Sequence, residues 1–153
     1  MTRDVRVLQR FRWLAPTNAT LLAEATMALA GAAVIIAFFP FRRLGALLGR
    51  RGATLRPPGA DERRVRQIRW AVEAAAKRVP WRAVCFQKGV ALHWMLRRRG
   101  IPTRLHYGVG KSPENQLAAH VWVSLDGATL MGGEVAHNFT CLATYPSDAP
   151  DPK

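Results

Sequence analysis

Residues 83–110 read AVCFQKGVALHWMLRRRGIPTRLHYGVG, and the hydrophobic period changes within this stretch. From Cys85 onward the apolar residues recur at helical spacing, and Gly100 follows three arginines at the point where a helix would end. Residues 103–110 then alternate between apolar and polar, which predicts a strand. This change of period predicts a helix that leads directly into a sheet.

The flanking segments extend the pattern to an α+β fold. Upstream, Asp61 is an N-cap residue for a helix that must end before Pro80. Downstream, the Asp126-Gly127 pair predicts a tight hairpin turn. Further strands are predicted over 118–125, 128–133 and 139–145. Helices followed by an antiparallel sheet define the class.

The chain of 153 residues is long enough for one hydrophobic core. We divide it into an N-terminal helical region with a linker (1–60), a core domain (61–146) and a flexible tail (147–153). Within the first region, residues 21–39 form an apolar helix that Pro40 ends. Its uncharged run is shorter than the ~20 residues that cross a bilayer. We therefore expect a buried helix, or one that docks on a partner or a membrane surface.

The net charge is +13, from 23 Lys and Arg against 10 Asp and Glu. Such a balance favours acidic peptides or anionic lipid surfaces as partners. Zinc-finger spacing and RNA-binding aromatic signatures are both missing from the sequence, so we expect no nucleic-acid partner, and we expect no metal or other cofactor. Two cysteines and an N-terminus unlike a signal peptide indicate a cytoplasmic protein, with membrane association through 21–39 as an alternative.

Cys85 stands where the predicted helix begins. Free amides and the positive end of the helix dipole stabilise a thiolate there. A thiolate nucleophile also needs a general base. His120 is the candidate, because it lies on a well-patterned strand with Trp122 on the same face, where the indole would exclude water. His93 is too far along the same helix, about 12 Å.

Three motifs carry a resemblance to a known family. PWRAVC (80–85), LRRRGIP (96–102) and AHVWV (119–123) are similar to the transglutaminase-like cysteine peptidases. Within them the chain most resembles the stand-alone leader peptidase of lasso peptide biosynthesis. The resemblance implies that Cys85 is the nucleophile and His120 the base. It also implies three partners, namely a precursor peptide as substrate, a separate leader-binding protein and the lasso cyclase.

The third catalytic residue is the least determined. Members of that family commonly carry an Asp twelve residues after the histidine, where this chain has Gly132. A two-residue hairpin loop would pair His120 with Gly133, and a three-residue loop with a bulge would pair it with Glu134. We choose Glu134 as the acid. Asp126, which we expect to form the turn, or a backbone carbonyl or water, are the alternatives.

The remaining site residues concern the oxyanion and the substrate. The Cys85 amide is a natural oxyanion donor, and Gln87 or Trp81 could add a side-chain N–H. We expect Cys141 to be a small buried hydrophobe. Two other functions stay open for this fold. One is a non-catalytic protein-binding module, and the other is an acyl transferase in which an amine rather than water resolves the acyl-enzyme.

Overall fold

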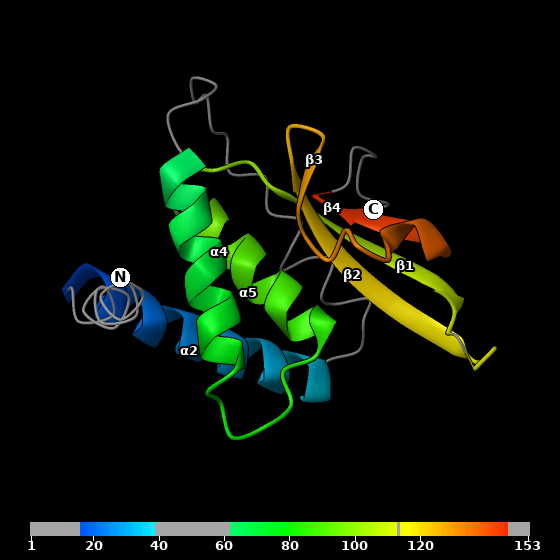
Figure 1. The fold of residues 1–153 in the computed structure, drawn as a ribbon, viewed down its shortest axis with the longest axis horizontal. Coiled ribbons are helices and arrows are strands. Elements are labelled where there is room, and N and C mark those ends of the chain that lie inside the picture. The colour runs from blue at the N-terminus through cyan, green and yellow to red at the C-terminus, as the bar shows by residue number, and fades with distance from the viewer. Residues whose placement is uncertain (1–15, 39–61, 113, 147–153) are drawn as a thin grey trace, which may run out of the picture.

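The computed structural model describes residues 16–38, 62–112 and 114–146, which form three helices followed by a four-stranded sheet. In chain order the elements are α2 (Pro16–Phe38), α4 (Glu62–Ala76), α5 (Cys85–Arg97), β1 (Arg104–Lys111), β2 (Leu117–Leu125), β3 (Ala128–Met131), the 3-10 helix η2 (Ala136–Asn138) and β4 (Phe139–Tyr145). Figure 1 shows the helices grouped on one side of the sheet. The predicted α+β class is confirmed.

The sheet is antiparallel, with the order β3-β2-β1-β4. Asp126 and Gly127 form the predicted turn between β2 and β3, with φ of 49° and 83°. Two successive left-handed residues are what a two-residue hairpin requires. The chain then passes through η2 to reach the far side of β1, where β4 pairs. The sheet therefore places β1 at its centre, between β2 and β4.

Most predicted boundaries agree with the structure to within a residue or two. The prediction is wrong for β3, which ends at Met131 rather than at residue 133, because Gly132 takes a left-handed φ of 77° and turns the chain away. Gly100, with φ of 75°, lies just beyond α5, as predicted. Asp61, Pro40, the linker and the C-terminal tail lie outside the described residues.

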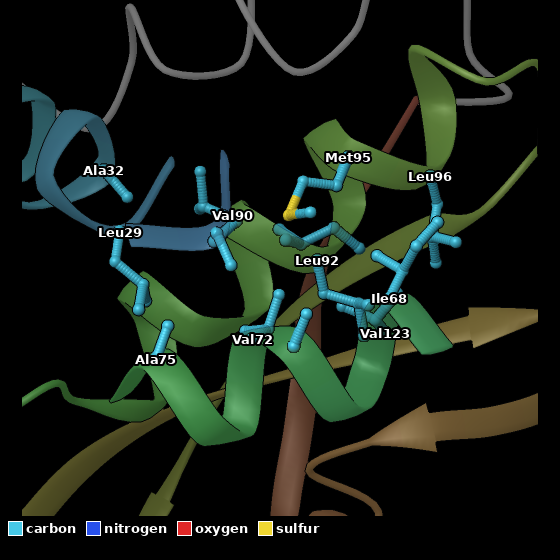
Figure 2. Packing of buried hydrophobic residues seen from close by; sticks show 14 of the residues in the cluster. Leu29, Ala32, Ile68, Val72, Ala75, Val90, Leu92, Met95, Leu96 and Val123 are labelled. Carbon is cyan, nitrogen blue, oxygen red and sulfur yellow. The ribbon is translucent and has the colours of Figure 1, made fainter. Parts of the chain in front are cut away.

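One hydrophobic core joins the helices to the sheet, with α5 in contact with α2, α4 and β2. Figure 2 shows α2, α4, α5 and β2 all contributing side chains to it. Helix and sheet approach each other closely at Gly89, where an added Cβ would lie 2.6 Å from the Val121 Cγ1. The missing side chain at Gly89 therefore lets the N-terminal half of α5 lie directly on β2.

The apolar helix predicted over 21–39 is α2, and it begins earlier, at Pro16. Three of its residues, Ala25, Leu29 and Ala32, are fully buried in the core. By length and composition alone, residues 18–38 could also cross a membrane, although core helices and signal sequences pass the same test. The expectation of a buried helix is met for one stripe of α2, while other apolar residues of the helix are exposed.

An ion pair joins α2 to the residues that directly follow α5. The Glu24 carboxylate accepts two hydrogen bonds from the Arg99 guanidinium, at 2.6 and 2.8 Å, and Arg98 lies 3.7 Å away. These hydrogen bonds, opposed by desolvation and aided by the nearby charges, lower the pKa of Glu24 below its usual 4.5. The pair therefore stabilises the fold above pH 4.5, and this contribution is lost as the pH falls and Glu24 takes up a proton.

Glu24→Gln is expected to lower the free energy of unfolding by about 1–2 kcal/mol at pH 7, because a half-buried Arg99 loses its charged partner. Denaturant unfolding at pH 7 and pH 3.5 checks this, since the difference between variant and parent should shrink at the lower pH. Glu62→Gln is the matched control, because the Glu62–Arg66 pair is exposed on α4. Equal losses of unfolding free energy in Glu24→Gln and Glu62→Gln would contradict a stabilising role for the Glu24–Arg99 pair.

Candidate active site

Cys85 is the first residue of α5 and is half-buried. Val84 precedes it in an extended conformation and provides no side-chain cap. The first amide to bond back along this helix is that of Lys88, to the Val84 carbonyl at 3.2 Å. The amides of Cys85 and the next two residues thus precede the first intrahelical bond, at the positive end of the helix dipole. The thiol stands where an anion is stabilised, as the sequence predicts.

Trp81 and Gln87 form a pair beside this helix end. The Trp81 indole Nε1–H donates to the Gln87 Oε1 at 3.1 Å. Because an indole nitrogen can only donate, this bond fixes which end of the Gln87 amide carries oxygen. Within the described ranges the Gln87 –NH2 has no partner, and Gln87 lies two residues after Cys85. Of the two candidate oxyanion donors, only Gln87 therefore keeps a side-chain N–H to offer.

The His120 ring is held by a backbone carbonyl. Its Nε2 lies 2.7 Å from the Gly132 oxygen. A carbonyl only accepts, so Nε2 must carry the hydrogen, and Nδ1 of the neutral ring is left to accept a proton. Among the described residues Nδ1 has no hydrogen-bond partner. The position twelve residues after the histidine thus contacts the ring, although it contributes a carbonyl rather than a carboxylate.

No hydrogen bond or ion pair joins Glu134, the acid chosen from the sequence, to His120 in the part of the chain that the structure describes. Glu134 is exposed and makes no hydrogen bond or ion pair within the described ranges. The β2–β3 pairing combines a two-residue turn with a bulge between Val123 and Ser124, and it places Val123 opposite Met131. If the strands continued in this register, Glu134 would lie opposite His120. The strand ends first, at Met131. Asp126 is confirmed as a turn residue and is exposed at the far end of the hairpin.

Cys85 and His120 each lie close in sequence to the same contact between α5 and β2. Gly89, one turn after Cys85, packs on Val121, the residue after His120. However, side chains alternate along a strand, and Val121 faces α5. The His120 imidazole projects from the other face, and no hydrogen bond joins it to the Cys85 thiol in the part of the chain that the structure describes. The structure brings the two backbones close but leaves the reacting groups on different faces.

Aromatic rings form a column on that other face. His106 stacks on Trp122 with ring centroids 5.4 Å apart, and Trp122 lies parallel to His120 at 6.2 Å. Phe139 closes the column 5.0 Å from His120. The Trp122 indole therefore lies beside the His120 ring, as predicted. The sequence analysis missed Phe139, because only the crossing from β3 to β4 brings it to this face.

His106 is fixed by two hydroxyl groups, with Nδ1 3.0 Å from Thr144 Oγ1 and Nε2 2.7 Å from Ser124 Oγ. Burial, and secondarily the charge of Arg104, lower the pKa of His106 below its usual 6.5. Below pH 6.5 the unfolded chain takes up this proton before the folded one does. Stability linked to His106 is therefore complete above pH 6.5 and is lost as the pH falls.

We expect the His106 NMR titration to have a midpoint below 6.5, and the thermal midpoint of the protein to fall as the pH is lowered from 7.5 to 5. In His106→Asn the thermal midpoint should depend less on pH. His137→Asn is the control, because His137 is an exposed histidine on η2. A pH dependence that is the same in His106→Asn as in the parent would contradict the assignment.

Cys141 is exposed rather than buried, and it lies on the edge strand β4 beside a bulge opposite Tyr107 and Gly108. His93 is fully buried on α5, with Nδ1 3.0 Å from the Thr103 hydroxyl. The described residues contain no group of three or more His, Cys, Asp or Glu arranged to hold a metal ion.

The helix that begins at the half-buried Cys85 packs on an antiparallel sheet whose second strand carries His120, and this arrangement defines the class of fold. The family model for the transglutaminase-like superfamily matches residues 27–144, and the chain belongs to this superfamily. The match includes α2 from Met27 onward as well as the helices and strands of the site. No curated protein and no solved structure matches the chain.

Proposed function

We propose that this protein is a cysteine peptidase that removes the leader from a lasso peptide precursor. The superfamily includes thiol enzymes that cleave or transfer acyl groups, and the three motifs around Cys85, Gly100 and His120 favour the lasso leader peptidases within it. The observation that carries the proposal is the half-buried Cys85 thiol at an uncapped helix N-terminus, two residues before the oriented amide of Gln87.

In the proposed reaction, Cys85 as a thiolate attacks the scissile carbonyl, and the oxyanion is stabilised by the Cys85 amide and the Gln87 –NH2. His120 Nδ1 takes the thiol proton and returns it to the departing amine, because Nε2 already carries a hydrogen towards Gly132. The departing amine is the N-terminus of the core peptide, and water then hydrolyses the thioester, which releases the leader as its free acid and regenerates the thiol. No cofactor takes part in these steps.

The transfer of a proton between Cys85 and His120 requires the imidazole and the thiol to approach each other, since they do not share a hydrogen bond in the structure. Alkylation by iodoacetamide tests this pair in a Cys141→Ala background, where Cys85 is the single thiol. If His120 activates the thiol, alkylation at pH 7 should slow by about tenfold or more in His120→Asn. Equal alkylation rates would remove His120 from the mechanism.

The reaction itself is tested by incubating the full chain with a lasso precursor peptide, with and without the leader-binding protein, and weighing the products. Separated leader and core support hydrolysis, and we expect them only with the leader-binding protein present. Loss of ammonia without chain cleavage would instead identify an acyl transferase. An unchanged precursor in the presence of the leader-binding protein and the cyclase would contradict the proposal.

A second candidate is a non-catalytic binding module that keeps the superfamily's fold. The observation that favours it is the placement of the His120 ring on the sheet face away from α5. This candidate requires that Cys85→Ala leave the biological function intact, whereas a peptidase would lose it. It also requires that His120→Asn leave the alkylation rate of Cys85 unchanged.

A further inference from the structure

Helix α2 carries a second apolar stripe, on the side away from the core. Met27, Val34 and Phe38 are 72%, 53% and 78% exposed. Their spacing of seven and four residues puts them on one side of the helix, opposite the buried stripe of Ala25, Leu29 and Ala32. A surface helix of a soluble domain normally has a polar outer side, whereas a helix that is apolar all round has something covering it.

The exposed stripe offers almost no hydrogen-bonding group. From residue 25 to residue 38 the one polar side chain is that of Thr26, and its hydroxyl donates to the Leu22 carbonyl of the same helix at 2.8 Å. Protein–protein interfaces usually carry about one hydrogen bond for each 100–200 Å². A surface with nothing to donate or accept is better matched by a hydrocarbon layer than by another protein.

The charge distribution is matched to an anionic surface. Every Lys and Arg of the chain except Lys153 lies within residues 1–111, and residues 112–146, which contain three of the four strands, have none. Arg63 and Arg64 are exposed on α4, which packs on α2. In the sequence, α2 is followed closely by Arg42 and Arg43. The helical half is therefore cationic, and the sheet half is not.

We propose that the stripe of Met27, Val34 and Phe38 docks this protein on an anionic lipid surface, with α2 lying along that surface. Buried apolar area would supply one part of the attraction, and arginines near phosphate groups would supply the other. The folded core stays intact in this arrangement, because Ala25, Leu29 and Ala32 remain packed on α4 and α5. The inference is independent of the Cys85 chemistry.

Sedimentation with lipid vesicles tests the proposal on the full chain. One set is pure phosphatidylcholine, and in the other about a third of the lipid is phosphatidylglycerol. We expect binding to the anionic set, weakened by salt, and a loss of at least about tenfold in the triple variant Met27→Gln/Val34→Gln/Phe38→Gln. Leu117→Gln/Leu142→Gln is the matched control, because these leucines are equally exposed on the sheet. Cys85→Ala should bind as the parent does.

Several outcomes would overturn the docking proposal. Failure of the parent chain to sediment with anionic vesicles is one, and equal binding by the triple variant is another, since arginines alone would then account for it. A dimer that the triple variant abolishes, without vesicle binding, would assign the stripe to a second copy. Loss of affinity for the leader-binding protein without vesicle binding would assign it to that partner. A lower thermal midpoint of the triple variant without vesicle binding would assign it to residues 1–15 or 39–61 of the chain itself.

Discussion

Cys85→Ala is expected to reduce leader cleavage by at least about 1,000-fold, because the proposed reaction passes through a thioester on this sulfur. The effect on stability should be small, since Cys85 is only half-buried and makes no hydrogen bond through its thiol in the described part of the chain. Mass spectrometry of the precursor over time gives the rate, and the thermal midpoint reports whether the variant is folded.

Cys141→Ala is the control for that experiment. Cys141 is an exposed thiol on β4, and its sulfur contacts the Thr144 hydroxyl at 3.7 Å and the Ala143 carbonyl at 3.5 Å. The Cys141→Ala variant should cleave the precursor at the parent rate. If Cys85→Ala cleaved as fast as the parent while Cys141→Ala did not, the nucleophile would have been assigned to the wrong cysteine. If both variants cleaved normally, the thiol mechanism would be excluded.

Gly89→Val should disrupt the packing of α5 on β2 without touching a reacting group. A Cβ at this position would lie 2.6 Å from Val121 Cγ1 and 3.7 Å from Leu105 Cδ1. The overlap should cost about 2–3 kcal/mol of unfolding free energy. It should also move the first turn of α5 off the sheet, and an error of about 1 Å in the position of Cys85 would lower the cleavage rate by about 100-fold.

Gly31 provides the comparison for Gly89, because it is also a helical glycine. Its added Cβ would meet only Trp94, at an ordinary 3.7 Å. Gly31→Ala should therefore raise the free energy of unfolding by up to about 1 kcal/mol, through helix propensity, while Gly89→Ala should not. Val121→Ala should restore much of what Gly89→Val loses. Similar stabilities for the two alanine variants, measured by denaturant unfolding, would show that α5 and β2 do not pack as described.

Local periodicity was sufficient to predict the helices and strands, because residues 83–110 and the strand that contains Trp122 have clear patterns of 3.6 and 2. The details that decide the chemistry depend on contacts that such patterns do not encode. The bulge at Val123 and the left-handed turn at Gly132 together put a carbonyl, and not Glu134, on the His120 ring. Neither feature changes the alternation of apolar residues.

The sequence also predicts only in part which side chains lie on which face of the sheet. Alternation predicts that His120 and Trp122 share a face, and they do. It does not say on which face the N-terminus of α5 will lie, because that depends on how Gly89 packs on Val121. The residue type of Cys141 and its place inside a predicted strand favour the interior. Cys141 is instead exposed on the edge strand β4, and that edge position is a property of the strand order.

The bond between His120 and the Gly132 carbonyl has a consequence for the step of the proposed reaction that expels the amine. A carbonyl selects the ring tautomer as a carboxylate does, but it supplies no full negative charge to the doubly protonated ring. Once the sulfur has bonded to the scissile carbon in the tetrahedral intermediate, the imidazolium no longer has an anionic thiolate as its neighbour. The imidazolium would then give up its proton readily to the departing amine. The absence of a third catalytic carboxylate beside the ring would therefore favour expulsion of the amine.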